Sequence, residues 1–464
     1  MEGIALIIAF VLAIVVMIVA ISKFKVHPFL AIMAVSLILA LLAGIPLTDV
    51  TLEDGTKISS IPNVIGAGFS GTFSSIGIVI ILGALIGSIL EKTGAALKLA
   101  DMIVKLVGKN HPEIAIELMG WVVSIPVFCD SGFVILDPIR RAMVKRTGTS
   151  SVAMTVALSV GLYISHVFIP PTPGPIAAAN TLGVGGNLLM VMGLGLLCSI
   201  LPLAAGYFFA KMIGRKVKSA DETSTDASKV TKTYEQLVAE YGKLPGGLNA
   251  VAPILVPILL MALGSIASMA GWTGTLFAIF DFLGKPVIAL IVGTIFAVIQ
   301  MGTSRKMADF YNVTNETLKT VGPILFVTAA GGVLGKVISS TSMVDFITSN
   351  SNVLGAVGIL FPFLLAAILK SAQGSSTVAI TTTAGIVAPL LPALGLGTPV
   401  RAALAVMAIG AGAMTVSHAN DSYFWVVTNF GEMTPEQGYK TQTLGTLVLG
   451  IAAMIEIFVL SLFL

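Results

Sequence analysis

Apolar runs of 18 or more residues recur along this chain from its first residues to its last. A helix of that length crosses the hydrocarbon core of a bilayer, which is about 30 Å thick. Hydrophobic residues make up 56% of the 464 residues and charged residues only 11%, too few polar side chains to cover a soluble body of this size. The chain is therefore predicted to be an all-α polytopic membrane protein. Its first run is expected to be retained, because no small-residue cleavage site follows it.

The predicted spans occur in the same order in both halves of the chain. They lie at about 3–22, 27–46, 73–91, 150–168 and 188–213 in the first half, and at about 249–270, 286–303, 320–338, 399–417 and 441–464 in the second. Between the third and fourth spans of each half lies an apolar segment with a break at its centre, at about 112–147 and 352–393. Residues 214–247 are polar and predict a hydrophilic linker between a first repeat, 1–213, and a second repeat, 248–464.

Each interrupted segment carries a charge next to a glycine. Asp130 lies two residues before Gly132, and Lys370 lies four residues before Gly374. The two glycines are 242 positions apart, about half the length of the chain. Local pairs support a repeat, because Gly-x-x-x-Gly, Gly-Thr and Ser-His sequences recur at offsets of 248, 249 and 252. In a membrane protein, interrupted helices at corresponding places in two halves are the best sequence indication of a substrate site.

The basic residues predict how the two halves are oriented. With the N-terminus outside, 21 of the 26 Lys and Arg residues fall on the inner side of the membrane. The first half then begins by crossing inward and the second by crossing outward. The repeats are therefore predicted to be inverted, with both termini external and the linker cytoplasmic, an architecture of many secondary transporters. Each interrupted segment is either a re-entrant hairpin or two full crossings, and its charge favours the hairpin.

The second break offers a cation and several hydrogen-bond donors. A lysine near the bilayer centre costs about 2.5–3.5 kcal/mol, so Lys370 is interpreted as an anchor for an anionic substrate, or alternatively as a structural lysine paired with an internal acid. A helix that starts after it would direct free N–H groups at a carboxylate, with hydroxyls for a polyol. The alternative is helix capping and close packing. The residues at this tip are Gln373, Gly374, Ser375, Ser376 and Thr377.

The first break places Asp130, Ser131 and Gly132 at the opposing tip. An acid in an apolar setting can take up and release a proton, so Asp130 is a candidate for proton coupling. It could equally bind substrate hydroxyls or neutralise Lys370. Ser131 and Gly132 are expected to contact the substrate from this side.

Two further segments close corresponding elements of the repeats. Prolines in 165–175 are expected to end a span and to hold the backbone extended beside the site, where Thr172 would meet the substrate. His166 ends the same span as His418 does in the second half, and imidazole suits a proton relay, with helix capping as the alternative. The segment after His418 adds Asn420 as a substrate contact and Asp421 as a proton carrier or capping residue.

Other classes of protein lack support in the sequence. No His/Asp/Glu cluster has metal-ligand spacing, and no Walker sequence occurs. No Ser-His-Asp arrangement can be recognised either, so no metal, cofactor or enzyme activity is expected. Cys129 and Cys198 are lone residues in apolar segments. The slight net charge of +3 is spread over short loops and gives no case for nucleic acid. Sodium-coupled uptake, a passive channel and a membrane-embedded enzyme are the alternatives to proton-coupled transport.

The motifs at the breaks resemble the gluconate permease (GntP-type) family of bacterial transporters over nearly the whole chain. They are Gly132-Phe133-Val134-Ile135-Leu136, Pro170-Pro171-Thr172-Pro173-Gly174-Pro175, Gly374-Ser375-Ser376-Thr377-Val378-Ala379 and Ser417-His418-Ala419-Asn420-Asp421 with Phe424-Trp425. The resemblance implies an inner-membrane symporter that takes up sugar acids or related small hydroxy or amino acids, driven by the proton gradient. It also implies a transport domain with re-entrant hairpins that moves in the bilayer against a homodimeric scaffold, as in elevator-type transporters.

The chain departs from the family pattern at the expected site. It has Cys129-Asp130-Ser131 where members associated with gluconate tend to have tyrosine, glutamate and valine. It has Thr172 where histidine is common, and Lys370 where arginine is common, which replaces a bidentate fork with a point charge. Gluconate or a related sugar acid is the expected substrate, with glycerate, D-serine or another small hydroxy acid as alternatives.

Overall fold

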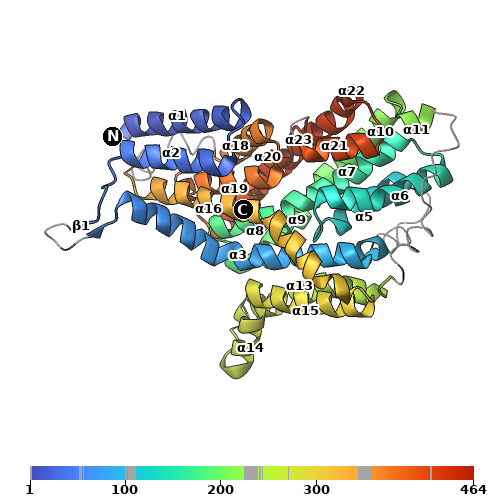
Figure 1. Cartoon of the computed structure of the whole chain (residues 1–464), viewed down its shortest axis with the longest axis horizontal. Coiled ribbons are helices and arrows are strands. Elements are labelled where there is room, and N and C mark those ends of the chain that lie inside the picture. The colour runs from blue at the N-terminus through green and yellow to red at the C-terminus, as the bar shows by residue number, and fades with distance from the viewer. Residues whose placement is uncertain are drawn as a thin grey trace.

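The computed structural model describes residues 3–51, 55, 57–99, 102, 111–223, 239, 242, 244–269, 271–342, 358–418 and 421–464. In this part of the chain the structure is helical apart from one small antiparallel sheet, in which Val50–Thr51 (β1) pairs with Lys57–Ile58 (β2). Eight helical stretches are long and apolar enough to cross a membrane. The prediction of a helical, multi-pass membrane protein is confirmed, and the small sheet is the exception to an all-α chain (Figure 1).

The helices follow a similar order in the two halves, with α14 as an addition in the second half. In the first half they are α1 (Gly3–Ser22), α2 (Pro28–Leu42), α3 (Ile61–Thr93), α5 (Pro112–Val123), α6 (Cys129–Thr147), α7 (Ser151–Phe168), α8 (Pro173–Thr181), η1 (Gly185–Asn187), α9 (Leu188–Leu197), α10 (Ile200–Lys216) and α11 (Ala220–Thr223). In the second half they are α13 (Gly247–Met269), α14 (Gly274–Gly284), α15 (Pro286–Thr303), η2 (Met307–Asp309), α16 (Phe310–Ser339), α18 (Leu360–Gln373), α19 (Ser376–Val387), η3 (Ala388–Leu390), α20 (Pro399–Met414), α21 (Ser422–Phe430), α22 (Pro435–Gly438), η4 (Tyr439–Thr443) and α23 (Leu444–Ser461).

Helices α3 and α16, which contain the third predicted span of each half, are longer than their apolar cores predict. Helix α3 has 33 residues and α16 has 30, whereas spans of 19 residues were expected from 73–91 and 320–338. The additional turns contain Asn, Ser, Thr and Gly, which interrupt the apolar run but not the helical backbone. The start of α3 is also held by Asp49, whose carboxylate accepts a hydrogen bond from the Ser60 amide at 2.7 Å. That hydrogen bond lowers the pKa of Asp49.

The proline-rich segment does not stay extended as expected. The span α7 ends at Phe168, but helix α8 begins at Pro173 after only four residues. A proline at the first position of a helix loses no hydrogen bond and already has a helical φ. Pro173 therefore starts helix α8, although Pro170 and Pro171 before it are not helical. The expectation of extended backbone is therefore wrong beyond Thr172.

Helices of the first half pack against helices of the second half at several places. Helix α2 packs against α16 of the other half, and α15 packs against α3. In the same way α8 packs against α19, and α21 packs against α6. Helices α3 and α16 run antiparallel along each other, with Gly68 near the start of α3 against Val333 near the end of α16. Any site at the centre of the protein is therefore built from both halves.

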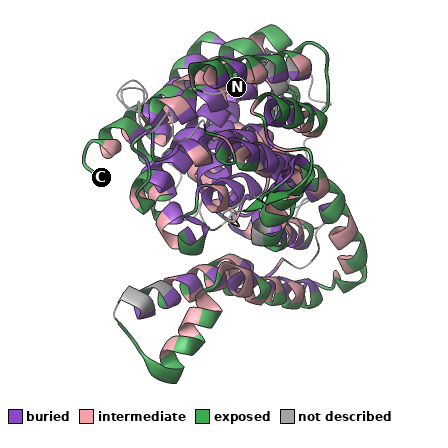
Figure 2. Ribbon diagram, turned by 90° about the vertical axis from the view of Figure 1, so that its left-hand side faces the viewer, coloured by how far each residue is buried: buried purple, intermediate pink, exposed green. Residues whose placement is uncertain are grey.

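Helices α13, α14 and α15 form a group that projects from the main body (Figure 2). Helix α14 has no buried residue, and apolar side chains such as Phe282 and Ile279 are exposed on it. Exposed apolar side chains on a helix of a membrane protein are in contact with lipid or with another protein chain.

Three of the interruptions between helices contain or adjoin the residues that were predicted for the substrate site. Helix α5 ends at Val123 and α6 begins at Cys129, so residues 124–128 form the first break. Gly374 forms the second, with a φ of 90° that favours glycine. The third lies after α20, where Val416 has a φ of 58°. This conformation is strained for a β-branched residue and is maintained by the surrounding structure.

Small residues allow the long helices α3 and α16 to approach neighbouring backbone, at the first break and elsewhere. On α3, Cβ atoms added at Gly83 and Gly87 would lie 2.6 Å and 2.1 Å from the carbonyl oxygens of Pro171 and Pro126. On α16, a Cβ atom at Gly335 would lie 2.7 Å from the carbonyl oxygen of Gly385 in α19. The two Gly-x-x-x-Gly sequences therefore serve close backbone packing in both halves.

Gly87 provides a test of this packing. Because its added Cβ would clash with the Pro126 carbonyl, we expect Gly87→Ala to lower the free energy of unfolding by about 1–3 kcal/mol. The measurement is the thermal midpoint of the purified protein in detergent. Gly77→Ala on the same helix is the matched control, since its nearest contact is 3.5 Å away and alanine is the better helix former. Equal midpoints for the two variants would contradict the close contact.

Candidate substrate site

An ion pair between two buried side chains lies where the second and third breaks meet. The Lys370 ammonium is 2.6 Å from Asp421 Oδ2, and the two side chains are 1% and 5% exposed. The carboxylate of Asp421 also accepts hydrogen bonds from Ser417 Oγ at 2.5 Å and from the Tyr423 amide at 3.1 Å. Asp421 therefore caps helix α21 and neutralises Lys370 at the same time.

The Lys370 ammonium has two further neighbours. It donates a hydrogen bond to the carbonyl oxygen of Gly374, which lies at the second break, and it lies 5.9 Å from the centre of the Tyr163 ring. The Tyr163 and Tyr423 rings are 5.0 Å apart, and the Tyr423 hydroxyl donates to the Ser159 carbonyl at 3.0 Å. Two tyrosines thus form a wall beside the ion pair and connect it to α7.

The first break reaches the same place from the first half of the chain. Asp130 Oδ1 accepts a hydrogen bond from Ser422 Oγ at 3.1 Å, and Ser422 follows Asp421 in the chain. The thiol of Cys129 lies 3.7 Å from the other carboxylate oxygen of Asp130. The structure therefore brings the two predicted tips together, but it pairs Lys370 with Asp421 and not with Asp130.

Helix α19 begins beside the ion pair with some of its amides uncapped. Ser375 is the N-cap residue, and its Oγ accepts a hydrogen bond from the Val378 amide at 3.3 Å. Ser376 and Thr377, which follow it, are buried. The first amides of a helix have no partner within the helix, so this terminus can bind an anion.

The other predicted residues are less central or differently engaged. The Thr172 hydroxyl is buried, 2.9 Å and 2.8 Å from the carbonyl oxygens of His166 and Ile169, so it faces its own backbone. His166 is buried beside Phe128, and its Nδ1 has no hydrogen-bond partner in the part of the chain that the structure describes. His418 is partly exposed. Asn420 lies outside the described residues, as does the side chain of Gln373, whereas Gly132 is buried in α6.

A polar cavity of about 410 Å³ adjoins the first break. Phe128 and Ser131 line it together with Glu91 of α3, which lies within hydrogen-bonding reach of Ser131. Glu91, Tyr163 and Tyr423 were not among the predicted site residues. An acid at the end of an apolar span and two of only seven tyrosines were the signals available in the sequence.

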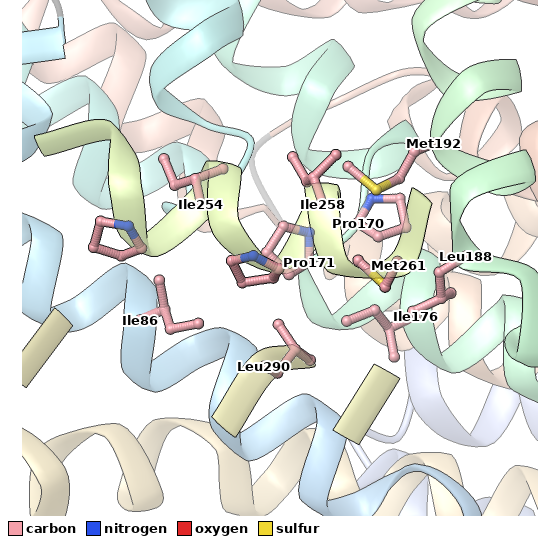
Figure 3. A pocket seen from close by; sticks show the side chains of 12 residues that line it. Ile86, Pro170, Pro171, Ile176, Leu188, Met192, Ile254, Ile258, Met261 and Leu290 are labelled. Atoms are coloured by element: carbon pink, nitrogen blue, oxygen red, sulfur yellow. The ribbon is translucent and has the colours of Figure 1, made fainter. Parts of the chain in front are cut away.

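An apolar crevice between α13, α15 and helices α8 and α9 has a different character (Figure 3). Pro170, Pro171, Ile254 and Ile258 are among the side chains that line it, and its volume is about 10 Å³. That volume is close to the minimum for one water molecule. Neither its size nor its lining suits a hydroxylated acid.

Comparison with known proteins decides the family. The model of the GntP family permeases matches residues 5–463. The chain belongs to the GntP permease family. It is 33% identical to an uncharacterized permease of Haemophilus influenzae over 91% of this chain and 85% of the relative. The prediction from the sequence motifs is thereby confirmed, and the chain is a membrane permease and not an enzyme.

Relatives in the family include named gluconate permeases. The gluconate permease of Zymomonas mobilis is 29% identical, over 96% of this chain and 95% of the relative. The Gnt-II system L-idonate transporter of Escherichia coli is 26% identical, over 94% and 95%. Among solved structures, the fold is similar to the YdaH transporter of Alcanivorax borkumensis, with a TM-score of 0.63 and 17% identity over 94% of this chain and 99% of that chain.

A charge-neutralising substitution tests the role of the buried pair in this permease. We expect Asp421→Asn to lower the free energy of unfolding by about 3–5 kcal/mol, because it leaves a buried ammonium without its carboxylate. Asp281→Asn is the matched control, since Asp281 pairs with Lys285 at 2.8 Å on the exposed surface. Such pairs contribute at most about 1 kcal/mol. Thermal unfolding in detergent measures both, and equal losses would contradict the buried pair's role.

Proposed function

We propose that this GntP permease is a proton-coupled symporter that takes up gluconate or a related sugar acid across the bacterial inner membrane. The observation that carries the proposal is the buried Lys370–Asp421 pair at the meeting point of the interrupted helices. A cation at that place suits a carboxylate substrate, and relatives that this chain matches over 95% of their length are named gluconate permeases. The acid that occupies the cation is itself a group that can be protonated.

Substrate and Asp421 compete for the same ammonium in this proposal. When Asp421 is ionised, it neutralises Lys370 and leaves no net charge for a second carboxylate. When a proton reaches Asp421, the Lys370 ammonium is left uncompensated, and burial makes an uncompensated charge costly. The carboxylate of gluconate then restores neutrality. Because each substrate anion requires a proton on Asp421, binding the two together is favoured over binding either alone.

The surrounding groups have defined roles in the proposal. The amides at Ser376 and Thr377 bind the substrate carboxylate at the start of α19. At the first break, Asp130 accepts hydrogen bonds from the substrate hydroxyls, and Ser131 donates hydrogen bonds to them. His166 or His418 transfers the proton between Asp421 and the aqueous phases. The Thr172 hydroxyl contributes by holding the backbone after α7, since it is engaged with carbonyl oxygens there.

Inverted repeats provide the route between the two sides of the membrane. Their support is the common helix order, the exchanged packing of α2 on α16 and of α15 on α3, and the distribution of Lys and Arg. In the proposal the segments α5–α6 and α18–α19 are re-entrant hairpins of a transport domain that moves as in elevator-type transporters. The scaffold is a homodimer, both termini are external, and the linker at 214–247 is cytoplasmic.

Uptake into proteoliposomes tests the proposed function. Labelled gluconate should accumulate when an inward proton gradient is imposed, and accumulation should be unaltered when choline replaces sodium. Lys370→Ala should abolish gluconate binding in a thermal-shift assay. Accumulation that ignores the proton gradient would contradict proton coupling, and normal affinity in Lys370→Ala would remove Lys370 from the site.

The Asp421→Asn variant separates exchange from coupling. Asparagine resembles protonated aspartate, so we expect this variant to bind gluconate independently of pH and to exchange it in counterflow. Accumulation driven by a proton gradient should fall at least about 100-fold, as expected when an essential charge state is lost. Asp281→Asn should behave as the unsubstituted protein does. Gradient-driven accumulation that survives in Asp421→Asn would show that another group carries the proton.

A further inference from the structure

Two cavities lie at opposite ends of the antiparallel pair of helices α3 and α16, and each has a volume of about 410 Å³. The one that adjoins the first break is called the inner cavity, and the other the outer cavity, after the predicted orientation. The inner cavity is lined by residues that include Ser88, Glu91, Lys92, Asp309, Glu316 and Thr320. The outer cavity is lined by residues that include Gly68, Thr72, Asn180, Lys336, Ser339 and Gly385.

The two cavities are built from corresponding positions of the repeats. The offset of 248 that relates the Gly-x-x-x-Gly sequences of α3 and α16 also relates Ser88 to Lys336 and Glu91 to Ser339. It relates Glu316 to Gly68 and Thr320 to Thr72 in the opposite direction. Four positions of one cavity therefore have an equivalent in the other, and the side chains at these positions differ.

Those side chains give the cavities opposite charge. The inner cavity has three acids and one lysine. Asp309 is paired with that lysine, Lys92, at 3.2 Å, and Glu316 is paired with Lys319, outside the lining, at 2.6 Å. Glu91 is the third acid and has no ion pair among the described residues. Among the described residues that line the outer cavity there is no acid, and Lys336 is the charged one. Lys336 is exposed and has no ion pair in the part of the chain that the structure describes. The outer cavity is thus cationic where the inner one is acidic.

The position of Lys336 is also unusual for a membrane protein. Basic residues are depleted from the outer side, and Lys336 is one of only four Lys and Arg residues predicted there. Gly71 of α3 also lines the cavity, and a Cβ atom added there would meet nothing within 4 Å, so a small molecule can approach the backbone of α3 at this residue. Thr72 and Asn180 add polar groups to the same wall. A cationic cavity with polar walls and no acid suits a hydroxylated carboxylate.

We propose that the outer cavity is a capture site in which the Lys336 ammonium binds the carboxylate of the substrate before it reaches Lys370. This inference rests on the proposed uptake of an acid anion. The acids of the inner cavity repel the same anion, so the charge difference between equivalent positions favours capture outside and release inside. A unit charge at about 4 Å from a carboxylate in water contributes about 1 kcal/mol, a factor of about 5 in binding.

The capture site is tested by initial rates of gluconate uptake. They are measured in intact cells of a strain that has no other uptake system for gluconate. We expect Lys336→Gln to raise the apparent KM about 3- to 10-fold with an unchanged maximal rate. The difference should shrink as ionic strength rises, because salt screens exposed charges. Lys57→Gln is the matched control, since Lys57 is an exposed lysine predicted on the same side and does not line the cavity.

The repeat supplies a second variant with an independent readout. Ser339→Glu introduces in the outer cavity the acid that Glu91 provides in the inner one, and should raise the KM by a similar factor. The glutamine of Ser339→Gln has nearly the same size as the glutamate of Ser339→Glu but no charge, so this variant should leave the KM unchanged. An unaltered KM in Lys336→Gln, or an equal increase in Lys57→Gln, would overturn the capture site. Absence of gluconate uptake by the unsubstituted protein would instead contradict the proposed function.

Discussion

The buried ion pair between Lys370 and Asp421 determines how the centre of this permease is organised. A lone ammonium in a medium of low dielectric constant is unstable, and a lone carboxylate equally so. The pair therefore holds together the end of α18, the loop after α20 and the start of α21. Hydrogen bonds from Ser417 and from the Tyr423 amide satisfy the rest of the carboxylate. The strained backbone at Val416 is maintained by this set of contacts.

The surroundings of this ion pair come from both halves of the chain. The pair itself lies in the second half, but Tyr163 lies over its cation from α7, and Asp130 reaches its neighbour Ser422 from α6. A close backbone contact at Gly87 lets α3 support the first break, and one at Gly335 packs α16 against α19, the helix that follows the second break. The charges at the centre are thus enclosed by elements that are far apart in the chain, which excludes water and strengthens their interaction.

Much of this arrangement could be predicted from the residues alone. Apolar runs predicted the helices, and charged glycine-containing breaks predicted which segments would meet. The partner of Lys370 could not be predicted, because Asp130 and Asp421 were both available and sequence spacing does not measure distance across a fold. The direction of the Thr172 hydroxyl could not be predicted either, because a short hydroxyl side chain donates a hydrogen bond to whichever carbonyl the local backbone presents. Proline at 173 was ambiguous because the same residue ends one helix and starts the next.

In the proposed mechanism, gluconate replaces Asp421 at the Lys370 ammonium only when Asp421 is protonated. Calorimetry of gluconate binding in buffers with different heats of ionisation measures the protons taken up on binding. The unsubstituted protein should take up a proton with the bound anion, and Asp421→Asn should bind gluconate without proton uptake. Gluconate binding with no proton uptake by the unsubstituted protein would contradict this mechanism.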